Sequence, residues 1–561
     1  MDSVVFLILR RMRVPLLVLV IVYAVAVLGF VLIPGEDDQG RPWHMGFFHA
    51  FYFVSFMGTT IGFGEIPYPF TDAQRFWALF MLYATVTAWI YSIGTLIALV
   101  QDPAFKRAVT EQRFARRVRR MVDPFYLVCG YGDTGSALVA SMSQRNQHAV
   151  VVDIEPRRIA ELDLQALPVY VPGLCADAAV PRHLIEAGLE HRCCRGVVAL
   201  TNVNEVNLKV AISSKLLRPG LMVVCRADAR DVEANMASFG TDHIVDPFET
   251  FAELLETALR APCQHLVHDW LGVEQGTRLP EPIYPPLQGL WIVCGYGRFG
   301  KAVIPKLEAA GLDVVVIEAT PERTGTPPQG CVVGWGTEAG TLLEAGADRA
   351  AAIVAGTNND TNNLSIIMTA REINPDLFVV LRQNEARNDR LFETVHADIR
   401  MHPSRTVAEK VRILLNTPLL YRFFGSMREE TNQWACELAS RMAGLVGDRP
   451  PEVWEVEIGE AQAHAVAAAL EHGDTVPLGL LLVDPREPDR ALRALALARE
   501  HGDRFERLPP GDRTLALGDR LLFCGAARAR TRQEWVLQNE RVLADVRQAH
   551  HAAGESGAAV S

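Results

Sequence analysis

Two long runs of uncharged, mostly apolar residues limit what the N-terminal part of this chain can form. Residues 14–35 (VPLLVLVIVYAVAVLGFVLIPG) contain no charged side chain, and neither do residues 76–101. A helix rises about 1.5 Å per residue, so about 20 apolar residues cross the roughly 30 Å hydrocarbon layer of a membrane. A signal peptide is the simpler alternative for the first run. The apolar part of a signal peptide spans only about 7–15 residues and is followed by a small-residue cleavage site. This run is longer, and no such site follows it. The two runs therefore predict two transmembrane helices.

A third uncharged run, residues 42–64, lies between these two. Basic residues precede the first predicted helix and follow the second, and such residues mark cytoplasmic flanks. Both ends of the chain are then cytoplasmic, which requires an even number of crossings of the cell (inner) membrane. The middle run is therefore expected to enter and leave from the outer side as a short helix and a loop. The flanking basic residues are Arg10, Arg11, Arg13, Lys106, Arg107, Arg113, Arg116, Arg117, Arg119 and Arg120.

The loop of this re-entrant segment has glycines at alternate positions. Its sequence is Thr59-Thr60-Ile61-Gly62-Phe63-Gly64-Glu65. Non-helical backbone at membrane depth is tolerated only where protein buries it or where it lines a water-filled path. Glycine permits backbone conformations closed to other residues, so successive carbonyl groups can face one axis and replace the hydration shell of a cation. The alternative is a glycine-rich turn in an ordinary membrane anchor.

The same loop resembles the T-V/I-G-Y/F-G-D/E selectivity filter of potassium channels, with Glu65 at the place of the usual acid. The resemblance implies K+ as the permeant ion and a homotetramer, because each chain supplies one of four filter strands. Many such channels carry a hinge glycine about 20 residues after the filter. This chain has Ala84 there, and Gly94 further along, so the position of the hinge stays open. The residues in register with the filter are Thr60, Ile61, Gly62, Phe63 and Gly64.

The rest of the chain contains an internal repeat. Residues 125–153 and 290–318 each have the pattern of a strand, a glycine-rich loop, a helix and a second strand that ends at an acidic residue. Gly130 corresponds to Gly295, and further along Thr201 corresponds to Thr357. Self-similarity over this length predicts two copies of one domain.

Each copy carries a G-x-G-x-x-G pattern. The pattern is weak by itself, but here each one follows an apolar strand, opens a helix and precedes an acid by about 20 residues, as in dinucleotide-binding folds. The acids, Asp153 and Glu318, are expected to bind a ribose diol, which favours NAD or ADP/ATP over NADP. Arg298 suits a phosphate, whereas Asp133 takes its place in the first copy, so the second copy is the stronger candidate for a diphosphate ligand. The other predicted cofactor-binding residues are Gly130, Gly132, Thr134, Gly135 and Thr201 in the first copy, and Gly295, Gly297, Phe299, Gly300 and Thr357 in the second.

The residues after these patterns resemble the N-lobe of RCK domains, the TrkA-N-like regulators of K+ conductance. The resemblance rests on Gly173 with Asp177, and on the runs ALTNVNEVN (199–207) and AGTNNDTNN (355–363). The predicted order is a two-span pore module (1–105), a basic linker (106–124), the first RCK domain (125–276), a proline-rich linker (277–289), the second RCK N-lobe with helices (290–446), an RCK C-lobe (447–528), and a polar helix with a disordered tail (529–561).

The predicted fold is an α-helical membrane pore module, with two transmembrane helices, a re-entrant pore helix and a filter, joined to α/β Rossmann-like tandem RCK domains and a small α+β C-lobe. The resemblance implies a ligand-gated, potassium-selective channel of the prokaryotic two-transmembrane type, and no enzyme. A membrane-anchored NAD-dependent oxidoreductase is the alternative. It requires a substrate domain with a proton-transfer residue and leaves the filter-like loop unexplained.

Charge and cysteine usage limit the partners. The chain carries a net charge of -11, which excludes nucleic-acid binding by bulk charge. The predicted partners are further copies of the chain, membrane lipid and a small nucleotide. The 10 cysteines include no CxxC pair, which predicts a reduced cytosolic body. No metal site is assigned, and whether a cation binds outside the pore stays open.

Overall fold

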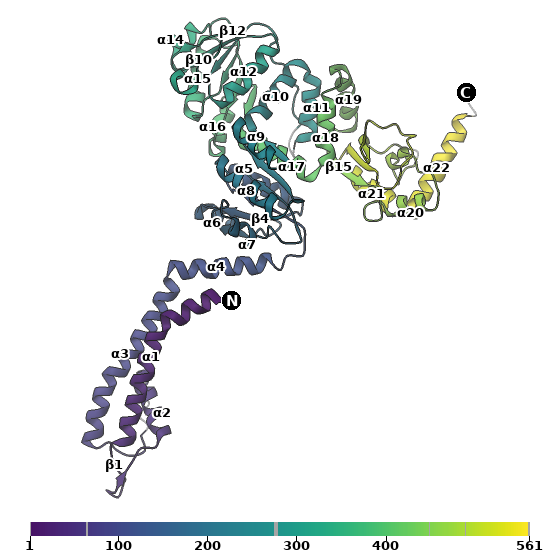
Figure 1. Cartoon of the computed structure of the whole chain (residues 1–561). Helices are drawn as coiled ribbons and strands as arrows, with labels where there is room; N and C mark the ends of the chain where they lie inside the picture. The colour runs from purple at the N-terminus through teal and green to yellow at the C-terminus, as the bar shows by residue number, and fades with distance from the viewer. Residues whose placement is uncertain (1, 63–65, 274–278, 448, 489, 559–561) are drawn as a thin grey trace. The chain divides into compact units, whose positions relative to one another are not determined.

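The structure is a computed structural model that describes residues 2–62, 66–273, 279–447, 449–488 and 490–558 (Figure 1). The chain divides into two compact units, Met1–Met121 and Val122–Ser561. Each is described by itself.

The first unit is helical. Its helices α1 and α3 lie side by side, and α2 packs against both (Figure 1). Phe30, Val54 and Met81 belong to the core between them. Residues Arg10–Leu32 of α1 and the whole of α3 are long and apolar enough to cross a membrane, whereas α2 is a shorter apolar helix, as the sequence predicted. The elements are α1 (Asp2–Leu32), β1 (Gly35–Glu36), β2 (Pro42–Trp43), α2 (Phe47–Gly58), α3 (Asp72–Gln101) and α4 (Pro103–Val118).

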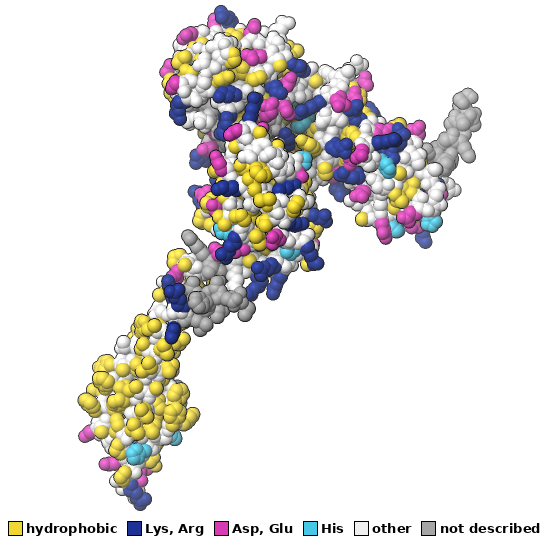
Figure 2. All heavy atoms as spheres, in the orientation of Figure 1, with side chains coloured by type: hydrophobic (Ala, Val, Ile, Leu, Met, Phe, Trp, Pro, Cys, Tyr) yellow, Lys and Arg dark blue, Asp and Glu magenta, His cyan; other side chains and the backbone are white. Residues whose placement is uncertain are grey.

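The outward faces of α1 and α3 are apolar. Leu17 is 50% exposed, Ile90 66% and Phe76 75%. Figure 2 shows apolar side chains gathered over the face of this unit that is in view. Water disfavours apolar surface of this extent, whereas the hydrocarbon of a membrane accommodates it.

Polar residues fix where the long helices begin. The side chain of Thr71 caps α3, and Gln74 returns the hydrogen bond, which makes a capping box. Asp102 caps α4 and forms an ion pair with Arg11 of α1 at 2.5 Å. Residues 106–118, expected within a linker, therefore belong to a capped helix.

The first copy of the repeat has a six-stranded parallel sheet in the order β5-β4-β3-β6-β7-β8. This is the strand order of the dinucleotide-binding fold. The strands on either side of the β3–β6 pair are added in opposite directions across the sheet, and a crevice opens at that point. The elements are β3 (Phe125–Cys129), α5 (Asp133–Gln144), β4 (His148–Asp153), α6 (Pro156–Leu164), β5 (Gly173–Cys175), α7 (Pro181–Glu186), β6 (Cys194–Ala199), α8 (Asn204–Leu217), β7 (Met222–Arg226), α9 (Arg230–Ser238), β8 (His243–Val245), α10 (Pro247–Arg260) and α11 (Pro262–Gly272).

The second copy repeats this sheet in the order β11-β10-β9-β12-β13-β14, also parallel. Its crevice lies between β9 and β12. The elements are β9 (Leu290–Cys294), α12 (Arg298–Ala309), β10 (Asp313–Glu318), α13 (Pro321–Thr324), β11 (Val332–Val333), α14 (Ala339–Glu344), β12 (Ala350–Ala355), α15 (Asp360–Ile373), β13 (Phe378–Arg382), η1 (Ala386–Asn388), α16 (Asp389–Thr394), β14 (Ile399–Met401), α17 (Pro403–Asn416), α18 (Pro418–Met427) and α19 (Asn432–Leu445).

The two copies exchange helices. Phe248, Phe251 and Leu255 of α10 pack in the core of the second sheet. Val407 and Val411 of α17 pack in the core of the first sheet. Each sheet is thus covered on one side by a helix from the other copy, so the two copies share their hydrophobic cores and hold both crevices in one unit.

The C-lobe has an antiparallel sheet in the order β15-β18-β16-β17. The predicted disordered tail has to be corrected, because α22 continues to Ala558, through a stretch rich in alanine, the strongest helix former. The single polar helix expected within residues 529–561 is two helices, and Val536 and Leu537 of the first are buried. The elements are β15 (Glu452–Glu457), α20 (His464–Glu471), η2 (Leu478–Leu482), β16 (Ala494–His501), β17 (Arg504–Arg507), β18 (Arg520–Gly525), α21 (Ala529–Gln538) and α22 (Glu540–Ala558).

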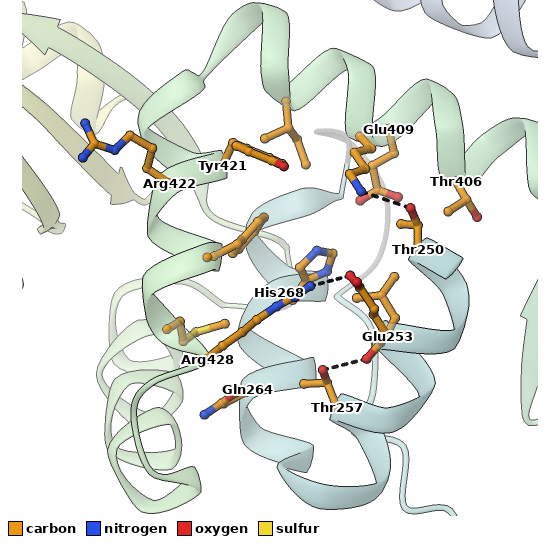
Figure 3. A pocket seen from close by; sticks show the side chains of 16 residues that line it. Thr250, Glu253, Thr257, Gln264, His268, Thr406, Glu409, Tyr421, Arg422 and Arg428 are labelled. Carbon is orange, nitrogen blue, oxygen red and sulfur yellow. Dashed lines mark hydrogen bonds and ion pairs between the residues drawn. The ribbon is translucent and has the colours of Figure 1, made fainter. Parts of the chain in front are cut away.

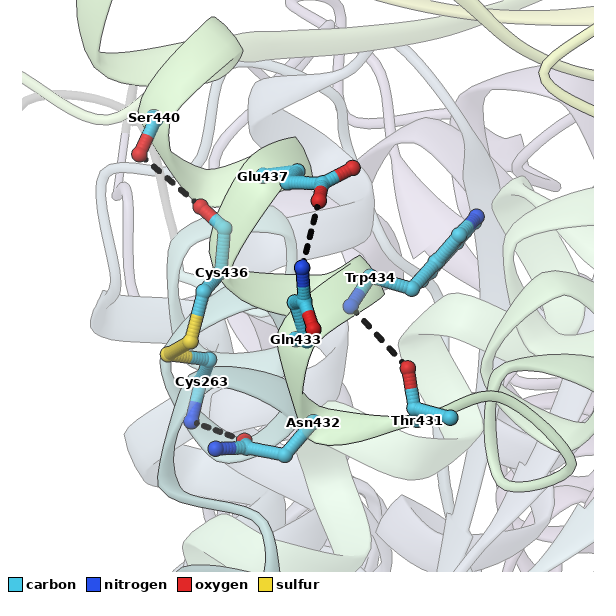
Figure 4. The surroundings of a disulfide bond; sticks show 8 residues. All are labelled: Cys263, Thr431, Asn432, Gln433, Trp434, Cys436, Glu437 and Ser440. Atoms are coloured by element: carbon cyan, nitrogen blue, oxygen red, sulfur yellow. Dashed lines mark hydrogen bonds between the residues drawn. A yellow bond between two sulfur atoms is a disulfide. The ribbon is translucent and has the colours of Figure 1, made fainter.

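A disulfide joins Cys263 of α11 to Cys436 of α19 (Figure 4). The two residues are 173 positions apart, and the prediction of uniformly reduced cysteines is wrong for this pair. The reason is tertiary: Val267 of α11 and Leu438 of α19 share a core, which brings the two cysteines together.

Candidate functional site

The described part of the filter-like loop alternates in backbone handedness. Thr60 and Gly62 have φ values of 59° and 65°, whereas Ile61 between them does not have a positive φ. Such alternation turns successive carbonyl groups to the same side of the chain. A β-branched residue such as Thr60 rarely adopts this conformation, and such outliers cluster at functional sites. Predicted filter residues Phe63 and Gly64, and the adjacent Glu65, lie outside the described residues.

Helix α2 positions this loop. The amides of Ile61 and Gly62 both donate to the carbonyl of Phe56 in its last turn, at 3.1 and 3.4 Å. The hydroxyl of Thr59 donates to the carbonyl of Ser55 at 2.8 Å. The loop therefore continues directly from the short apolar helix, as a re-entrant segment requires.

The glycine loops of the two copies have the same conformation. Gly130 and Gly295 have φ values of 101° and 105°, which favour glycine. A Cβ on Gly135 would lie 2.0 Å from the carbonyl oxygen of Gly130. A Cβ on Gly300 would lie 2.2 Å from that of Gly295. The third glycine of each pattern thus lets the helix begin close to the end of the strand.

The two ribose-acid candidates hold these loops in place. The Asp153 carboxylate accepts from the amide of Tyr131 at 2.5 Å and from that of Glu155 at 2.8 Å. The Glu318 carboxylate accepts from the amides of Tyr296 at 2.6 Å and Thr320 at 2.8 Å. A carboxylate has about four acceptor positions, so both acids keep capacity for a ligand hydroxyl.

The two glycine loops differ in which side chain lies next to the second glycine of the pattern, Gly132 or Gly297. A Cβ on Gly132 would lie 3.2 Å from a guanidinium nitrogen of Arg158. The same atom on Gly297 would meet nothing within 4 Å. Arg158 is turned inward because it pairs with Asp153 at 3.5 Å and with Glu155 at 2.9 Å. The phosphate position of the second cleft is therefore the more open one.

The threonines at the ends of β6 and β12 are fixed by buried asparagines. The hydroxyl of Thr201 donates to Asn207 Oδ1 at 2.7 Å, and that of Thr357 to Asn363 Oδ1 at 2.6 Å. Asn207 and Asn363 are fully buried. Both threonines line their clefts, so they form rigid walls beside the glycine loops.

Three arginines gather between the two clefts. Arg226 and Arg382, at matching positions of the copies, are 9% and 8% exposed. Arg298 forms an ion pair with Asp228 of the first copy and so reaches across to it. Burial, with the charge of Arg298 adding to it, lowers the pKa of Arg382 to about 10. Arg382 Nε is also buried without a hydrogen-bond partner, which leaves positive charge available for an anion.

Both clefts are large enough for a nucleotide, and the first one also uses residues of the second copy. The first has a volume of about 730 Å³ and includes Arg298, Arg382 and Asn384 of the second copy in its lining. The second has a volume of about 510 Å³ and is lined by Arg298 and Arg382. Asp133 accepts from the amide of Ala386 at 3.2 Å, so it faces the second copy. Ligand pockets usually measure about 300–1,000 Å³.

Not every predicted residue lines a cleft: Gly135 and Gly300 serve the packing of the helix on the strand, and the structure adds residues that were not predicted. The Phe299 side chain does not line a cleft, because it is fully buried against Phe248 and Phe251 in the core of the second copy. Arg158 and Arg323 line their clefts and were not predicted. Each follows the ribose acid of its copy at the same spacing, a signal that aligning the two copies would have found.

In the described ranges, no three His, Cys, Asp or Glu side chains gather as a metal site.

Comparison with known proteins agrees with both parts of the molecule. Residues 16–102 match the family described as "Ion channel" and residues 126–247 and 291–403 match the TrkA-N domain. Potassium channel protein 1 of Methanocaldococcus jannaschii is 22% identical over 41% of this chain and 67% of its own length. The voltage-gated potassium channel Kch of Escherichia coli is 29% identical over 22% of this chain and 32% of its own.

Among solved structures, the GsuK channel superposes with a TM-score of 0.50 at 17% identity, covering 96% of this chain and 100% of that one. This likeness shows the fold. A further structure of the GsuK channel, bound to NAD, has a TM-score of 0.46.

The first unit has two candidate membrane helices and a filter-like loop with positive φ values. The second unit has two clefts of the dinucleotide-binding type. These features define a channel protein with regulatory domains of a nucleotide-binding fold. The ion-channel match, the two TrkA-N matches and relatives named potassium channel proteins together support a prokaryotic K+ channel with RCK domains.

Proposed function

We propose that this chain forms one quarter of a homotetrameric, K+-selective pore in the cell membrane, and that NAD or an adenine nucleotide binding between the Rossmann sheets changes how often the pore opens. Both chain ends are cytoplasmic in this proposal, and the RCK copies form a ring below the pore.

One observation carries the nucleotide part: positive charge gathers at the clefts, and one buried donor of Arg382 has no acceptor. Arg382 is buried with its Nε unpartnered, and Arg298 projects from the first turn of α12, beside the glycine loop. The partial positive charge of a helix N-terminus adds to theirs. The space over Gly297 is open, so a diphosphate there would add negative charge to the cleft that Arg298 and Arg382 line.

The rest of the second cleft suits the other parts of a nucleotide. Glu318, 6% exposed, lies at the end of β10, where a ribose diol is bound in this fold. Trp335 lines the same cleft and is 53% exposed, so it offers a flat face to an adenine ring. The glycine loop takes the phosphates. In the first cleft Arg158 covers Gly132, so binding there requires that side chain to move.

The pore part rests on the alternating handedness at Thr60 and Gly62 and on the ion-channel family match. An oxidoreductase would leave both unexplained. K+ selectivity follows if four such loops surround one axis and their carbonyls replace the hydration shell of the ion.

Planar-bilayer recording of the purified chain with unequal K+ and Na+ tests the pore. A reversal potential near that for K+ is expected, and equal permeability would refute selectivity. Gly62→Ala is expected to abolish conduction while assembly persists, because alanine disfavours a φ of 65°.

Excised patches exposed to NAD, ADP and ATP test the regulation. The open probability of the wild type is expected to change with at least one of them. Glu318→Ala removes the diol acceptor and should lose that response with ion selectivity unchanged. Asp153→Ala should also lose the nucleotide response only if the first cleft is occupied too. This variant therefore distinguishes one regulatory site from two.

A further inference from the structure

A second kind of cavity lies within the helices that join the two copies. It has a volume of about 380 Å³ and is enclosed by α10 and α11 of the first copy and α17 and α18 of the second (Figure 3). Neither glycine loop lines it. We call it the four-helix pocket, and the side chains that define it are Thr250, Glu253, His268, Lys410, Phe424 and Arg428.

Lys410 brings a positive charge into this pocket, and its ammonium group has few direct partners. Its Nζ donates to the hydroxyl of Thr250 at 3.1 Å. Within the described part of the chain it forms no ion pair, although an ammonium has three donors. Burial lowers the pKa of Lys410, against the opposite effect of Glu253. The site therefore favours a bound anion, which would satisfy the remaining donors.

The other charged side chains of the pocket already have partners, including Arg422, which pairs with Glu500. Arg428 pairs with Glu253 at 2.7 Å, which closes one side of the pocket as a neutral pair. Glu409 lies against the end of α11, since a Cβ on Gly272 would be 2.5 Å from its Oε1. Lys410 is thus the charge that a ligand has to balance.

An aromatic wall stands beside this cation. The ring of His268 lies over that of Phe424, with centroids 4.3 Å apart and planes 33° apart. Figure 3 shows His268 projecting from its helix into the space between the helices. His268 Nδ1 is buried without a hydrogen-bond partner, and Asp269 Oδ1 is 3.8 Å away, too far to accept. A buried polar atom in this state gains from a bound partner.

We propose that the four-helix pocket binds a small organic anion, with its carboxylate or phosphate at Lys410 and Thr250 and a flat ring against His268 and Phe424. The walls come from both copies, so the anion binds best to one arrangement of α10 and α11 against α17 and α18. Any change in that arrangement is coupled to its binding. This site is independent of the nucleotide clefts.

Calorimetric titration of the full-length chain in detergent with phenyl phosphate tests the proposal. Saturable binding with a Kd below about 1 mM is expected, and benzoate in its place distinguishes a carboxylate from a phosphate site. Lys410→Met is expected to weaken binding at least tenfold. The matched control is Lys209→Met, which removes an exposed lysine of α8 and should bind as the wild type does.

A second variant fills the cavity from a position where the added side chain begins in open space. Gly425 lines the pocket within α18, and a Cβ there meets nothing within 4 Å. Gly425→Leu is expected to abolish phenyl phosphate binding without lowering the melting temperature, because leucine favours a helix more than glycine does. Gly444→Leu is its control, since that glycine of α19 has equally open space and lies outside the pocket.

The proposal is overturned if the wild type shows no saturable binding of either probe at about 1 mM. It is also overturned if Lys410→Met and Gly425→Leu bind phenyl phosphate as the wild type does. Loss of binding in Gly297→Val, with both pocket variants unaffected, would place the anion in the nucleotide cleft and would refute the four-helix site.

Discussion

Replacing Gly297 by valine separates ligand binding from folding in the second cleft. The residue has φ -73° and ψ -165°, an extended conformation that valine adopts readily. Its Cβ would meet nothing within 4 Å, so the free energy of unfolding should change by no more than about 0.5 kcal/mol. The added methyl groups occupy the space above the loop, where the proposed phosphate approaches the backbone.

The expected loss of affinity follows from the contacts that valine prevents. Hydrogen bonds to a charged group contribute about 1.5–3 kcal/mol each. Losing one or two of them costs about 3 kcal/mol, which is roughly a 100-fold weaker Kd. Calorimetric titration of the full-length chain with NAD and ADP measures this, and a thermal unfolding scan measures the stability of the same sample.

Gly300→Ala is the matched contrast. Its Cβ would lie 2.2 Å from the carbonyl oxygen of Gly295, so the helix has to shift, at a cost of about 1–3 kcal/mol in stability. The reasoning is refuted if Gly297→Val binds nucleotide as the wild type does. It is equally refuted if Gly297→Val loses as much stability as Gly300→Ala. Gly132→Val applies the same test to the first cleft.

Three further predictions concern topology, pH and the disulfide. Asp38→Cys should react with an impermeant thiol reagent on intact cells, and labelling only after lysis would reverse the proposed topology. Burial, followed by the charge of Asp246, raises the pKa of Glu233 to about 7. The folded state favours the protonated form of Glu233, so the contribution of this group to stability is complete below about pH 4.5 and is lost as the pH rises through about 7. Glutamine stays neutral, so Glu233→Gln should raise the melting temperature more at pH 8 than at pH 5. Equal shifts at the two pH values would contradict this. Removing the disulfide by Cys263→Ser should lower stability by up to about 5 kcal/mol in non-reducing buffer, because the chain-entropy effect grows with the 173-residue separation. Cys436→Ser should lower stability by the same amount. In scanning calorimetry, reductant should abolish the difference between the wild type and both variants. A difference that persists in reductant would contradict a stabilising disulfide.

The sequence was informative wherever a short pattern has one physical meaning. An apolar run of about 20 residues is long enough to cross a membrane, and a glycine in the re-entrant loop permits the positive φ now seen at Gly62. The G-x-G-x-x-G patterns were interpretable for the same reason, since Gly135 and Gly300 leave no room for a Cβ. Phe299, one position before Gly300, shows the limit of the pattern: its side chain turns into the core.

The tertiary structure decided how the two copies meet. Helix α10 packs on the second sheet and α17 on the first, and no local pattern distinguishes a helix that covers its own sheet from one that covers its neighbour's. That exchange places Arg298 against Asp228, brings Cys263 to Cys436 and encloses Lys410. These contacts join residues 70 or more positions apart in the printed sequence. They depend on packing between whole elements, whereas the spans and glycine loops depend on backbone sterics and hydrophobicity that each segment carries by itself.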